Sequence, residues 1–267
     1  GRARGPAWVE DGPAAAEVYG DEPLLLAAVA PTLVARDRRT GVIAIEADAR
    51  PYTVVVMDDG LQNPAIAKDL AIALVDGTRG IGNGEVIPAG PLRAPFDFQI
   101  GLADAIVVRD PPAPADEDPD GVYAVLRRGF LGPVMIARVR ANGDTSWVAQ
   151  RPLLAFAGIA NPRRFYRLLE KLGGKLVDTV SFPDHHPFTP ADAAKLIGAA
   201  RATGAQLVTT EKDFARLKGD AALAELAEAT RIVAIEMRIA DSDTGRIASL
   251  IDAAVKGTSR RQRPPAP

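Results

Sequence analysis

The chain has 267 residues, 47% of them hydrophobic and 25% charged, and its formal net charge at pH 7 is −2. This composition is typical of a globular protein with material for one large domain or two ordinary ones. The small net charge does not indicate a nucleic-acid-binding protein, and the absence of cysteine excludes disulfides, thiolate metal sites and cysteine nucleophiles. No apolar run approaches the roughly 20 residues that cross a bilayer as a helix.

Residues 1–20 are rich in Gly, Pro and Ala, and we expect them to be irregular. Beyond them, short apolar runs predict the elements of the first half of the chain. These are helices over residues 21–29 and 40–49, and strands over residues 33–35, 52–57, 70–75 and 105–108. A Pro- and Asp-rich linker over residues 111–120 leads to two further strands, 122–126 and 134–139, which we expect to pair with each other.

From residue 153 onward, predicted strands and helices alternate. The strands are expected over residues 154–159, 175–180, 206–209 and 232–235, and the helices from residues 162, 190 and 211 and over residues 244–255. This pattern predicts an α/β fold with two α/β domains joined by a short two-stranded β linker. We expect an N-terminal domain over residues 1–120, the linker over 121–150, a C-terminal domain over 151–257 and a disordered basic tail over 258–267.

Residues 52–62 join an apolar run to two adjacent acids. The β-branched run that ends at Met57 is typical of a strand buried on both faces, as in the middle of a parallel sheet. It stops at Asp58 and Asp59, which are followed by Gly60. Acids at the carboxyl end of such a strand are typical of a magnesium site in nucleotide enzymes. An acidic turn after a core strand explains the same residues equally well, because Asp-Gly is a common turn pair.

A long Gly- and Pro-rich stretch over residues 77–95 separates two predicted strands. Loops of this length are costly to order and are usually functional or disordered. The stretch is not the dinucleotide-binding fingerprint, because its glycines precede no clear helix. Arg79 and Arg93 within it are candidates for binding an anion, since mobile loops that carry arginine often close over phosphates.

His185 and His186 are the two histidines of the chain, and they lie in a loop bounded by prolines. Histidine is the commonest catalytic base near neutral pH, and the neighbouring Asp184 could orient an imidazole. Two adjacent histidines are also typical of an ordinary solvated loop, and these residues alone favour that interpretation. A zinc site is not expected, because only carboxylates could complete its ligand shell.

Asp21 and Glu22 are explained more simply as acids in the first turn of a helix than as a site. Lys212 follows a predicted strand and could contact a phosphate, or could equally belong to an exposed first helical turn. No Gly-x-x-x-x-Gly-Lys-Ser/Thr phosphate loop occurs in the chain. A magnesium-binding strand of this type normally works beside such a loop.

Several short motifs, taken together and in order, resemble the tetraacyldisaccharide 4'-kinases of lipid A synthesis. The resemblance extends from near residue 1 to about residue 255. The motifs are Gly20-Asp-Glu-Pro23, Asp58-Asp-Gly-Leu-Gln62, Arg79-Gly-Ile-Gly-Asn-Gly84, Pro88-Ala-Gly-Pro-Leu-Arg93, Ala155-Phe-Ala-Gly-Ile-Ala-Asn-Pro162, Phe182-Pro-Asp-His-His186 and Thr209-Thr-Glu-Lys-Asp213.

The resemblance implies transfer of the γ-phosphoryl group of ATP to the 4'-hydroxyl of a tetraacylated glucosamine disaccharide 1-phosphate, which gives lipid IVA. It implies a P-loop-kinase-like, Rossmann-like fold of two α/β/α domains. ATP and Mg²⁺ are the implied cofactors. The acylated disaccharide 1-phosphate and a membrane surface are the implied partners, and no nucleic acid is expected. The implied location is the cytoplasmic face of the bacterial inner membrane.

The motifs also imply roles for individual residues. Asp21 and His185 would form the pair that takes the proton from the sugar hydroxyl, with Asp184 beside the histidine. We expect His185, rather than His186, to be the functional histidine. The implied metal ligands are Asp58, Asp59 and Glu22. The residues expected to bind substrate or phosphate are Gln62, Arg79, Asn83, Arg93 and Lys212.

Two features depart from the family pattern. Asn63 stands where the family usually has histidine, and an amide can hydrogen-bond but cannot titrate. The phosphate loop and the N-terminal membrane anchor of the family would precede Gly1, so we expect the chain to begin inside a longer protein and to be inactive alone. Two alternatives remain open: a non-catalytic module that binds lipid or a partner, and a P-loop kinase that acts on another acceptor.

Overall fold

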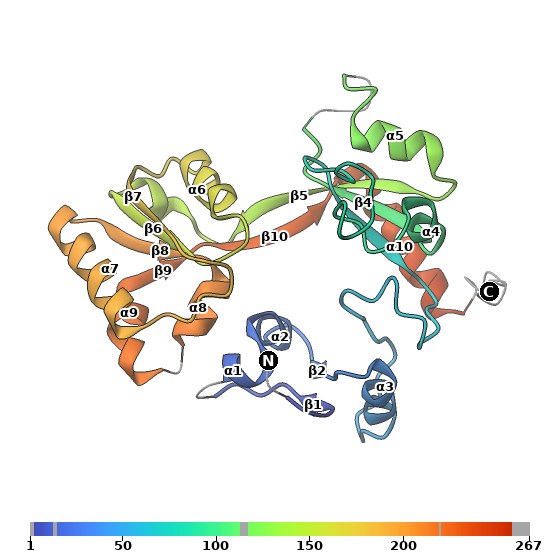
Figure 1. The fold of residues 1–267 in the computed structure, drawn as a ribbon, viewed down its shortest axis with the longest axis horizontal. Coiled ribbons are helices and arrows are strands. Elements are labelled where there is room, and N and C mark those ends of the chain that lie inside the picture. The colour runs from blue at the N-terminus through green and yellow to red at the C-terminus, as the bar shows by residue number, and fades with distance from the viewer. Residues whose placement is uncertain (1–2, 13–14, 113–116, 219, 258–267) are drawn as a thin grey trace. The chain divides into compact units, whose positions relative to one another are not determined.

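A computed structural model describes residues 3–12, 15–112, 117–218 and 220–257, so the predicted tail over 258–267 lies outside the described residues (Figure 1). The chain forms two compact units, each built from two separate stretches. Unit 1 comprises Gly1–Asp48 and Ala141–Ile235, and unit 2 comprises Ala49–Arg140 and Glu236–Pro267. The predicted boundaries at residues 120 and 150 do not coincide with the limits of these units.

Unit 1 contains a four-stranded parallel sheet with the strand order β7-β6-β8-β9. Its strands are β6 (Leu153–Ala157), β7 (Leu176–Ser181), β8 (Gln206–Thr209) and β9 (Thr230–Ile232). The helices between and beside them are α6 (Pro162–Lys171), α7 (Pro190–Thr203), α8 (Glu211–Leu217) and α9 (Ala224–Ala229). The first stretch of the unit adds α1 (Ala15–Tyr19), α2 (Asp21–Ala27), α3 (Arg38–Glu46) and an antiparallel pair, β1 (Ala7–Trp8) with β2 (Leu33–Val34).

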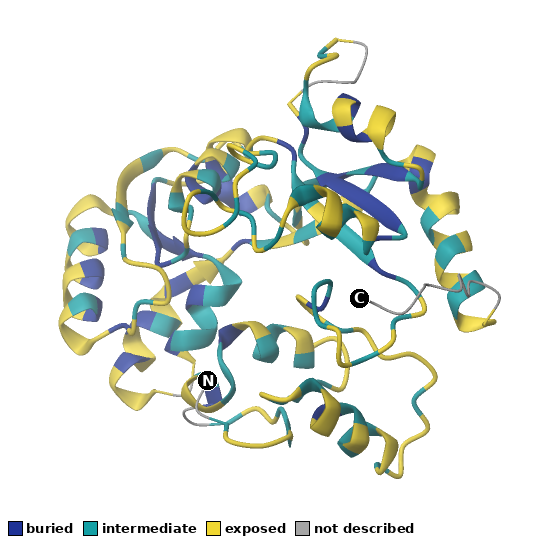
Figure 2. Ribbon diagram, turned by 45° about the vertical axis from the view of Figure 1, so that its right-hand side comes forward, coloured by how far each residue is buried: buried dark blue, intermediate teal, exposed yellow. Residues whose placement is uncertain are grey.

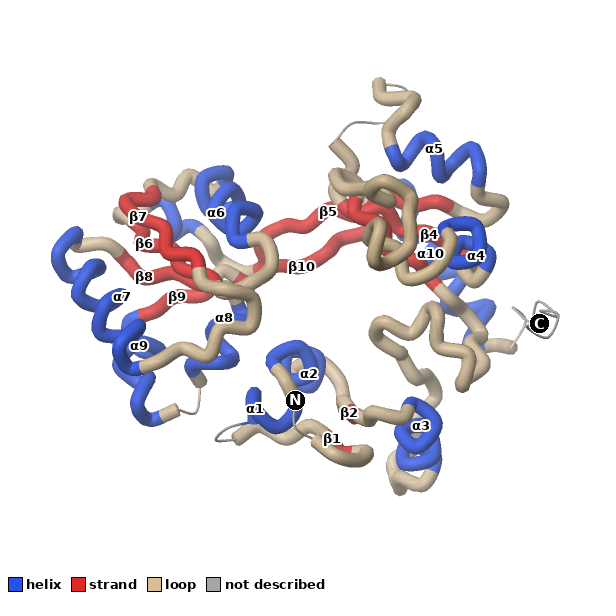
Figure 3. The backbone as a smooth tube through the Cα atoms, viewed as in Figure 1, coloured by secondary structure: helices blue, strands red, loops and turns tan. Residues whose placement is uncertain are grey.

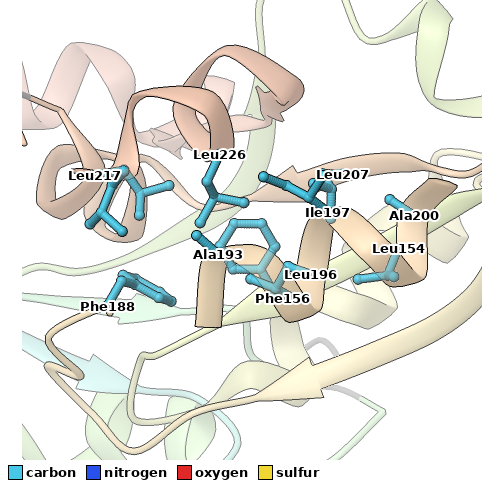
Figure 4. Close-up of a cluster of buried hydrophobic side chains, with 11 residues drawn as sticks. Leu154, Phe156, Phe188, Ala193, Leu196, Ile197, Ala200, Leu207, Leu217 and Leu226 are labelled. Atoms are coloured by element: carbon cyan, nitrogen blue, oxygen red, sulfur yellow. The ribbon is translucent and has the colours of Figure 1, made fainter. Parts of the chain in front are cut away.

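The core of unit 1 lies on both faces of β6, whose residues are all fully buried. On one face, Phe156 packs with the α7 residue Leu196 and with Leu226 of α9, in the cluster shown in Figure 4. On the other face, Ala155 packs with Leu169 of α6. A strand covered on both faces requires a continuous apolar sequence, which is why Leu-Leu-Ala-Phe-Ala was predictable from the sequence.

Unit 2 contains a second four-stranded sheet, with the order β10-β5-β4-β3. Its strands are β3 (Ile72–Asp76), β4 (Ala105–Arg109), β5 (Val134–Asn142) and β10 (Ala234–Ile239), and β3, β4 and β5 run parallel. Its helices are α4 (Phe96–Gly101), α5 (Val122–Gly129) and α10 (Asp241–Val255). Buried residues, dark blue in Figure 2, concentrate in the central strands such as β4. The parallel sheet of unit 1 and the three parallel strands of unit 2, with their helices, confirm the predicted α/β fold class.

The predicted strand over residues 52–57 is wrong: these residues form an irregular segment, drawn as loop in Figure 3. Val54, Val55 and Val56 are 52%, 55% and 89% exposed, whereas a central strand would bury them. A β-branched run becomes a strand only when a neighbouring backbone pairs with it, and none of the strands in the described part of the chain does so. A high strand propensity without a pairing strand therefore does not produce a strand here.

The predicted strand over residues 122–126 is also wrong, because this segment is the first part of helix α5. A short apolar run does not distinguish a strand from one face of a buried helix. Val122 and Leu126 are four residues apart, so both lie on the helix face that packs against Val108 and Val134. The neighbours of β5 in the sheet are consequently β10 and β4, and not the 122–126 segment.

Smaller differences from the prediction concern residues 1–20 and the strand expected over residues 232–235. Residues 1–20 are not uniformly irregular, since β1 and α1 form within them. The strand expected over residues 232–235 is divided between β9 and β10, with Val233 between them. None of the helices in the described ranges combines the length and the apolar character that crossing a bilayer requires.

Candidate active site

Asp21 opens helix α2 and is the buried acid of the site, with 7% of the residue exposed. The preceding Gly20 has a φ of 96°, a left-handed conformation that favours glycine and turns the chain sharply into the helix. Helix α2 packs against α8 of the same unit. This packing places the Asp21 carboxylate beside residues that are more than 160 positions further along the chain.

His185 lies against Asp21, and its Nδ1 atom is 3.4 Å from Asp21 Oδ2. Its backbone φ of 57° is in the left-handed region, which a residue other than glycine adopts only when its surroundings hold it there. Asp184 accepts a hydrogen bond from the His185 backbone N–H at 3.1 Å, and its Oδ1 atom is 3.9 Å from His185 Nε2. The imidazole is 60% exposed, so one side faces Asp21 and the rest is open to a substrate.

Arg216 of α8 makes the strongest contacts of Asp21. Its Nη2 and Nε atoms donate to Asp21 Oδ2 at 2.7 Å and 3.2 Å. Its third nitrogen, Nη1, donates to Asp213 Oδ1 at 2.9 Å and to the carbonyl oxygen of Gly158 at 3.0 Å. The arginine side chain is only 9% exposed, and this buried cation is paired with two carboxylates.

Gly158, the residue after β6, connects these groups through its backbone. Its N–H donates to Asp213 Oδ1 at 3.0 Å, and its carbonyl accepts from both Arg216 and the backbone N–H of His185. Asp213 also accepts from the hydroxyl of Thr210, which caps α8 by accepting from the Asp213 N–H. A side chain at Gly158 would meet Asp213 and Arg216 at 3.2 Å and 3.3 Å, so glycine allows this close approach.

The surroundings shift the pKa values of the two acids in opposite directions. Burial favours the neutral form of Asp21, but the hydrogen bonds and the charge of Arg216, with a further contribution from His185, hold its pKa below the ordinary value of 3.8. Burial is the largest influence on Asp213 and raises its pKa, despite the hydrogen bond from Thr210 and the charge of Arg216. Asp21 is therefore ionised at neutral pH and can stabilise a protonated imidazole.

Two other predicted site residues, Glu22 and Lys212, contact each other as an ion pair. Both side chains are substantially exposed. The pair joins the first turns of α2 and α8, next to the Asp21–Arg216 contact. Lys212 thus has a carboxylate partner in this structure, and its expected contact with phosphate stays a prediction.

His186 belongs to a different set of contacts from His185. Its Nε2 atom is 3.0 Å from Asp192 Oδ2, and its ring stacks on Phe182 at a centroid distance of 4.6 Å. Its ring also meets Phe188 edge-on. Of the two adjacent histidines, the structure therefore brings His185 to Asp21 and uses His186 to fix the loop.

The second group of predicted site residues lies in unit 2. Asp59, with a left-handed φ of 49°, accepts two parallel hydrogen bonds from Arg93 at 2.9 Å and 2.8 Å. These bonds are the reason that the pKa of Arg93 is raised above its ordinary value. Asp58 precedes it in the same turn. Arg93 is thus placed by an acid of the predicted magnesium motif.

The remaining predicted residues of unit 2 stabilise loops. Gln62 donates to the Gln99 side chain at 2.6 Å, and Asn83 donates to the carbonyl oxygen of Ala89 at 2.9 Å. The exposed Arg79 lies in the turn after β3, where its backbone N–H donates to Asp76 Oδ1. Their expected contacts with substrate or phosphate stay predictions.

The acids of the magnesium motif are Asp58 and Asp59. Magnesium prefers oxygen ligands and usually binds one or two carboxylates together with water and phosphate oxygens, which suits Asp58 and Asp59. In the ranges that the structure describes, no three His, Cys, Asp or Glu side chains gather closely enough to hold a metal by themselves. The donor chemistry fits, and phosphate oxygens would have to complete the shell.

Arg216 and Asp213 were not predicted as site residues. The Thr209-Thr-Glu-Lys-Asp213 motif includes Asp213 but does not extend to Arg216. One local signal was present, namely an acid and an arginine three residues apart on a helix that follows a strand. The contact of Arg216 with Asp21 spans 195 positions and has no local signature.

Comparison with known sequences identifies one family over nearly the whole chain. The family model described as tetraacyldisaccharide-1-P 4'-kinase matches residues 1–256. A tetraacyldisaccharide 4'-kinase of Nitrobacter winogradskyi is 41% identical over 257 residues, which cover 96% of this chain and 74% of that protein. A Bradyrhizobium protein of the same name is 42% identical over 99% of this chain and 74% of its own length.

Comparison of the structure gives the same result for the fold. The crystal structure of LpxK from Aquifex aeolicus in complex with ATP superimposes with a TM-score of 0.65 and 23% sequence identity, over 95% of this chain and 76% of that one. The fold expected from the motifs is therefore confirmed. With the sequence matches, these results show that the chain belongs to the tetraacyldisaccharide 4'-kinase family.

Proposed function

We propose that the protein containing this chain transfers the γ-phosphoryl group of ATP to the 4'-hydroxyl of a tetraacylated glucosamine disaccharide 1-phosphate, as the names of its relatives indicate. The observation that carries this proposal is the Asp21–His185 pair, with 3.4 Å between the carboxylate and the imidazole. An imidazole oriented by a buried acid and open on its other side is the arrangement of a general base.

In the proposed reaction, His185 Nδ1 carries a proton directed at Asp21, which leaves Nε2 able to accept one. The sugar O–H bond breaks as its proton passes to Nε2 and the oxygen forms a bond to the γ-phosphorus. The bond from the γ-phosphorus to the bridging oxygen breaks at the same time, and ADP leaves. The ionised Asp21 stabilises the imidazolium that results.

We propose Asp58 and Asp59 as the carboxylates that would hold magnesium. When bound, such an ion supplies positive charge that offsets the negative charge developing on the transferring phosphoryl group. Since both oxygens of Asp59 accept from Arg93, Arg93 would be held beside this position as a second cation. Glu22 pairs with Lys212 in this structure, and its expected role as a metal ligand stays a prediction.

We further propose that the reaction takes place at the cytoplasmic face of the inner membrane. Four acyl chains hold the proposed acceptor in a bilayer, whereas ATP is a soluble donor, so the two meet at the membrane surface.

The test is an assay of the protein as its gene encodes it, with labelled ATP and detergent-dispersed acylated disaccharide 1-phosphate. We expect the labelled product to be the 4'-phosphate. His185→Ala should lower kcat on the order of 100- to 10,000-fold, because a positioned base contributes that much. Asp58→Ala should also abolish most of the activity.

The control is His186→Gln, which alters the neighbouring histidine that contacts Asp192 instead of Asp21. This variant should keep kcat within about threefold of the wild type, in line with a residue that touches no reacting group. Normal 4'-phosphorylation by His185→Ala or Asp58→Ala would contradict the roles. Equal transfer to a soluble deacylated sugar would contradict the proposed acceptor.

A further inference from the structure

Arg216 is a buried arginine whose three side-chain nitrogens all donate hydrogen bonds. Two of its nitrogens donate to Asp21 Oδ2, and the third donates to Asp213 and to the carbonyl of Gly158. Burying a guanidinium costs free energy unless it is paired and hydrogen-bonded. With 9% of its side chain exposed, Arg216 is tied to the buried acid that faces His185.

The atom that Arg216 binds is also the atom nearest to the imidazole. Asp21 Oδ2 accepts from Arg216 at 2.7 Å and 3.2 Å and lies 3.4 Å from His185 Nδ1. The position of this oxygen therefore determines which ring nitrogen faces the acid and which faces outward. A planar guanidinium with two bonds to one oxygen restricts that position more than a single bond would.

A second link runs through the carbonyl of Gly158. It accepts from Arg216 Nη1 at 3.0 Å and from the backbone N–H of His185 at 3.0 Å. The arginine and the histidine loop are thus anchored on the same backbone oxygen. Because His185 is held in a left-handed conformation there, a change at Arg216 is expected to reach it by this route as well as through Asp21.

The charges around His185 point to the same role. Asp21 and Asp184 face the imidazole, and Asp213 lies behind Asp21. Arg216 is the cation within this group of acids. The adjacent Glu22–Lys212 pair consists of one acid and one base, so it changes the net charge around His185 little. Without the arginine, the excess negative charge would favour a protonated imidazole, and a protonated imidazole cannot accept a proton.

We propose that Arg216 is a positioning residue for the proposed phosphoryl transfer, which acts on His185 through Asp21 and through the Gly158 carbonyl. It fixes the oxygen that orients the imidazole, and it offsets part of the negative charge that surrounds the base. Asp213 holds the opposite end of the guanidinium in place. This inference rests on the proposed function, since it concerns the same base.

The first test compares Arg216→Gln with the wild type in the kinase assay. We expect kcat to fall on the order of 10- to 100-fold, as a misplaced catalytic group does, with KM for ATP changed less than about threefold. The acid limb of the kcat–pH profile should move to higher pH, because the base becomes protonated more easily. A kcat within threefold of the wild type, or an unmoved acid limb, overturns the proposal.

The matched control is Lys218→Gln, two positions further along the chain. It removes the same charge from a pair with Asp11 in which both side chains are more than half exposed. It should leave kcat and the acid limb unchanged. Arg216→Lys should return the acid limb to its wild-type position with a reduced kcat, because lysine keeps the charge but cannot span both acids.

A double-mutant cycle separates positioning from a merely structural role. In a His185→Ala background the base is absent, so Arg216→Gln should lower the residual rate by less than about threefold. A fall of equal size in both backgrounds overturns the proposal. If Arg216→Gln does not fold, the same cycle is run with Arg216→Lys, and a fall of equal size in both backgrounds again overturns the proposal.

A measurement that needs no turnover keeps the two proposals distinguishable. The chain has two histidines, so their ring signals can be titrated by NMR and assigned with His186→Gln. The titration midpoint of His185 should rise in Arg216→Gln and stay in Lys218→Gln. An unmoved midpoint overturns the inference and leaves the kinase proposal standing. A raised midpoint in a protein that transfers no phosphate rejects the kinase proposal alone.

Discussion

At the scale of single residues, Asp192 is an acid outside the site whose carboxylate makes three contacts. Its Oδ2 atom accepts from the Thr189 N–H at 2.9 Å and from the Thr189 hydroxyl at 2.7 Å, and it lies 3.0 Å from His186 Nε2. The Asp192 N–H donates back to the Thr189 hydroxyl, which completes a capping box at the start of α7. One carboxylate therefore caps a helix and fixes the loop that carries His185.

We predict that Asp192→Ala lowers the free energy of unfolding of unit 1 by about 0.5–2 kcal/mol, as loss of a helix cap does. Burial alone would raise the pKa of Asp192, but the hydrogen bonds from Thr189 and His186 hold it below 3.8. A pKa lowered in the folded state means that the stabilisation is fully present well above the ordinary pKa of 3.8 and is lost as pH falls through the folded value. Urea unfolding of the wild type and of Asp192→Ala between pH 7 and pH 3 measures this difference in the free energy of unfolding.

The matched control for that experiment is Lys195→Ala on the same helix. Lys195 is exposed, so this change should alter stability by less than about 0.5 kcal/mol. The difference between wild type and Asp192→Ala should shrink toward zero at the acid end of the range. A difference that stays constant down to pH 3 would show that the carboxylate charge is not what stabilises the cap.

At the scale of elements, a single hydroxyl ties helix α6 to strand β7. Tyr166 donates from its hydroxyl to the carbonyl of Val180 at 2.9 Å, and the same oxygen lies 3.1 Å from the hydroxyl of Ser181. Burial is the main reason that the pKa of Tyr166 is raised. The contact fixes how α6 lies across the end of β7.

We predict that Tyr166→Phe lowers the free energy of unfolding by about 1 kcal/mol, because one partly buried hydrogen bond is lost and the ring packing is kept. Tyr19→Phe on α1 is the matched control, and its effect should stay below about 0.5 kcal/mol. Thermal or urea unfolding of the two variants makes the comparison. Equal effects of the two changes would mean that the Tyr166 hydroxyl stabilises nothing specific.

The elements that were predictable are those whose local pattern and packing agree. Helix α7 has Thr189 as its cap, Pro190 at its first position and Gly204 at its end with a φ of 63°, and the structure has the helix with those limits. Strand β6 is apolar throughout because both its faces are covered. In such segments local preference and tertiary contacts point the same way.

The elements that were mispredicted are those where tertiary contacts decide. Val54–Met57 has the composition of a central strand but no pairing partner among the described strands. Residues 122–126 have the composition of a strand, but their apolar positions fit one face of α5. The site shows the same limit. The Asp21–His185 pair came from the resemblance of motifs, while Arg216 could be found only from a contact that spans 195 positions.

At the scale of the whole molecule, each unit has hydrophobic clusters of its own. Phe156 belongs to a cluster made of unit 1 residues, and Met135 belongs to one made of unit 2 residues, and both side chains are fully buried. Truncating either side chain leaves a cavity that costs about 2–5 kcal/mol. The effect of each change should remain in the unit whose cluster it disrupts.

We predict that Phe156→Ala accelerates amide hydrogen exchange in β6 and β8 and leaves β3 and β4 nearly unchanged. Met135→Ala should do the opposite, with β4 and β5 exchanging faster. Hydrogen-exchange mass spectrometry of the two variants under native conditions tests this. If either substitution speeds exchange equally in both sheets, the units unfold as one and the prediction fails.

The construction of unit 1 from two stretches has a consequence for folding during synthesis. Asp21 leaves the ribosome 195 residues before Arg216, so at about 5–20 residues per second the first stretch waits roughly 10–40 s for its partners. Throughout that time α2 has no α8 to pack against. We therefore expect nascent chains stalled before residue 206 to leave α2 open to proteases, and chains released after residue 235 to protect it.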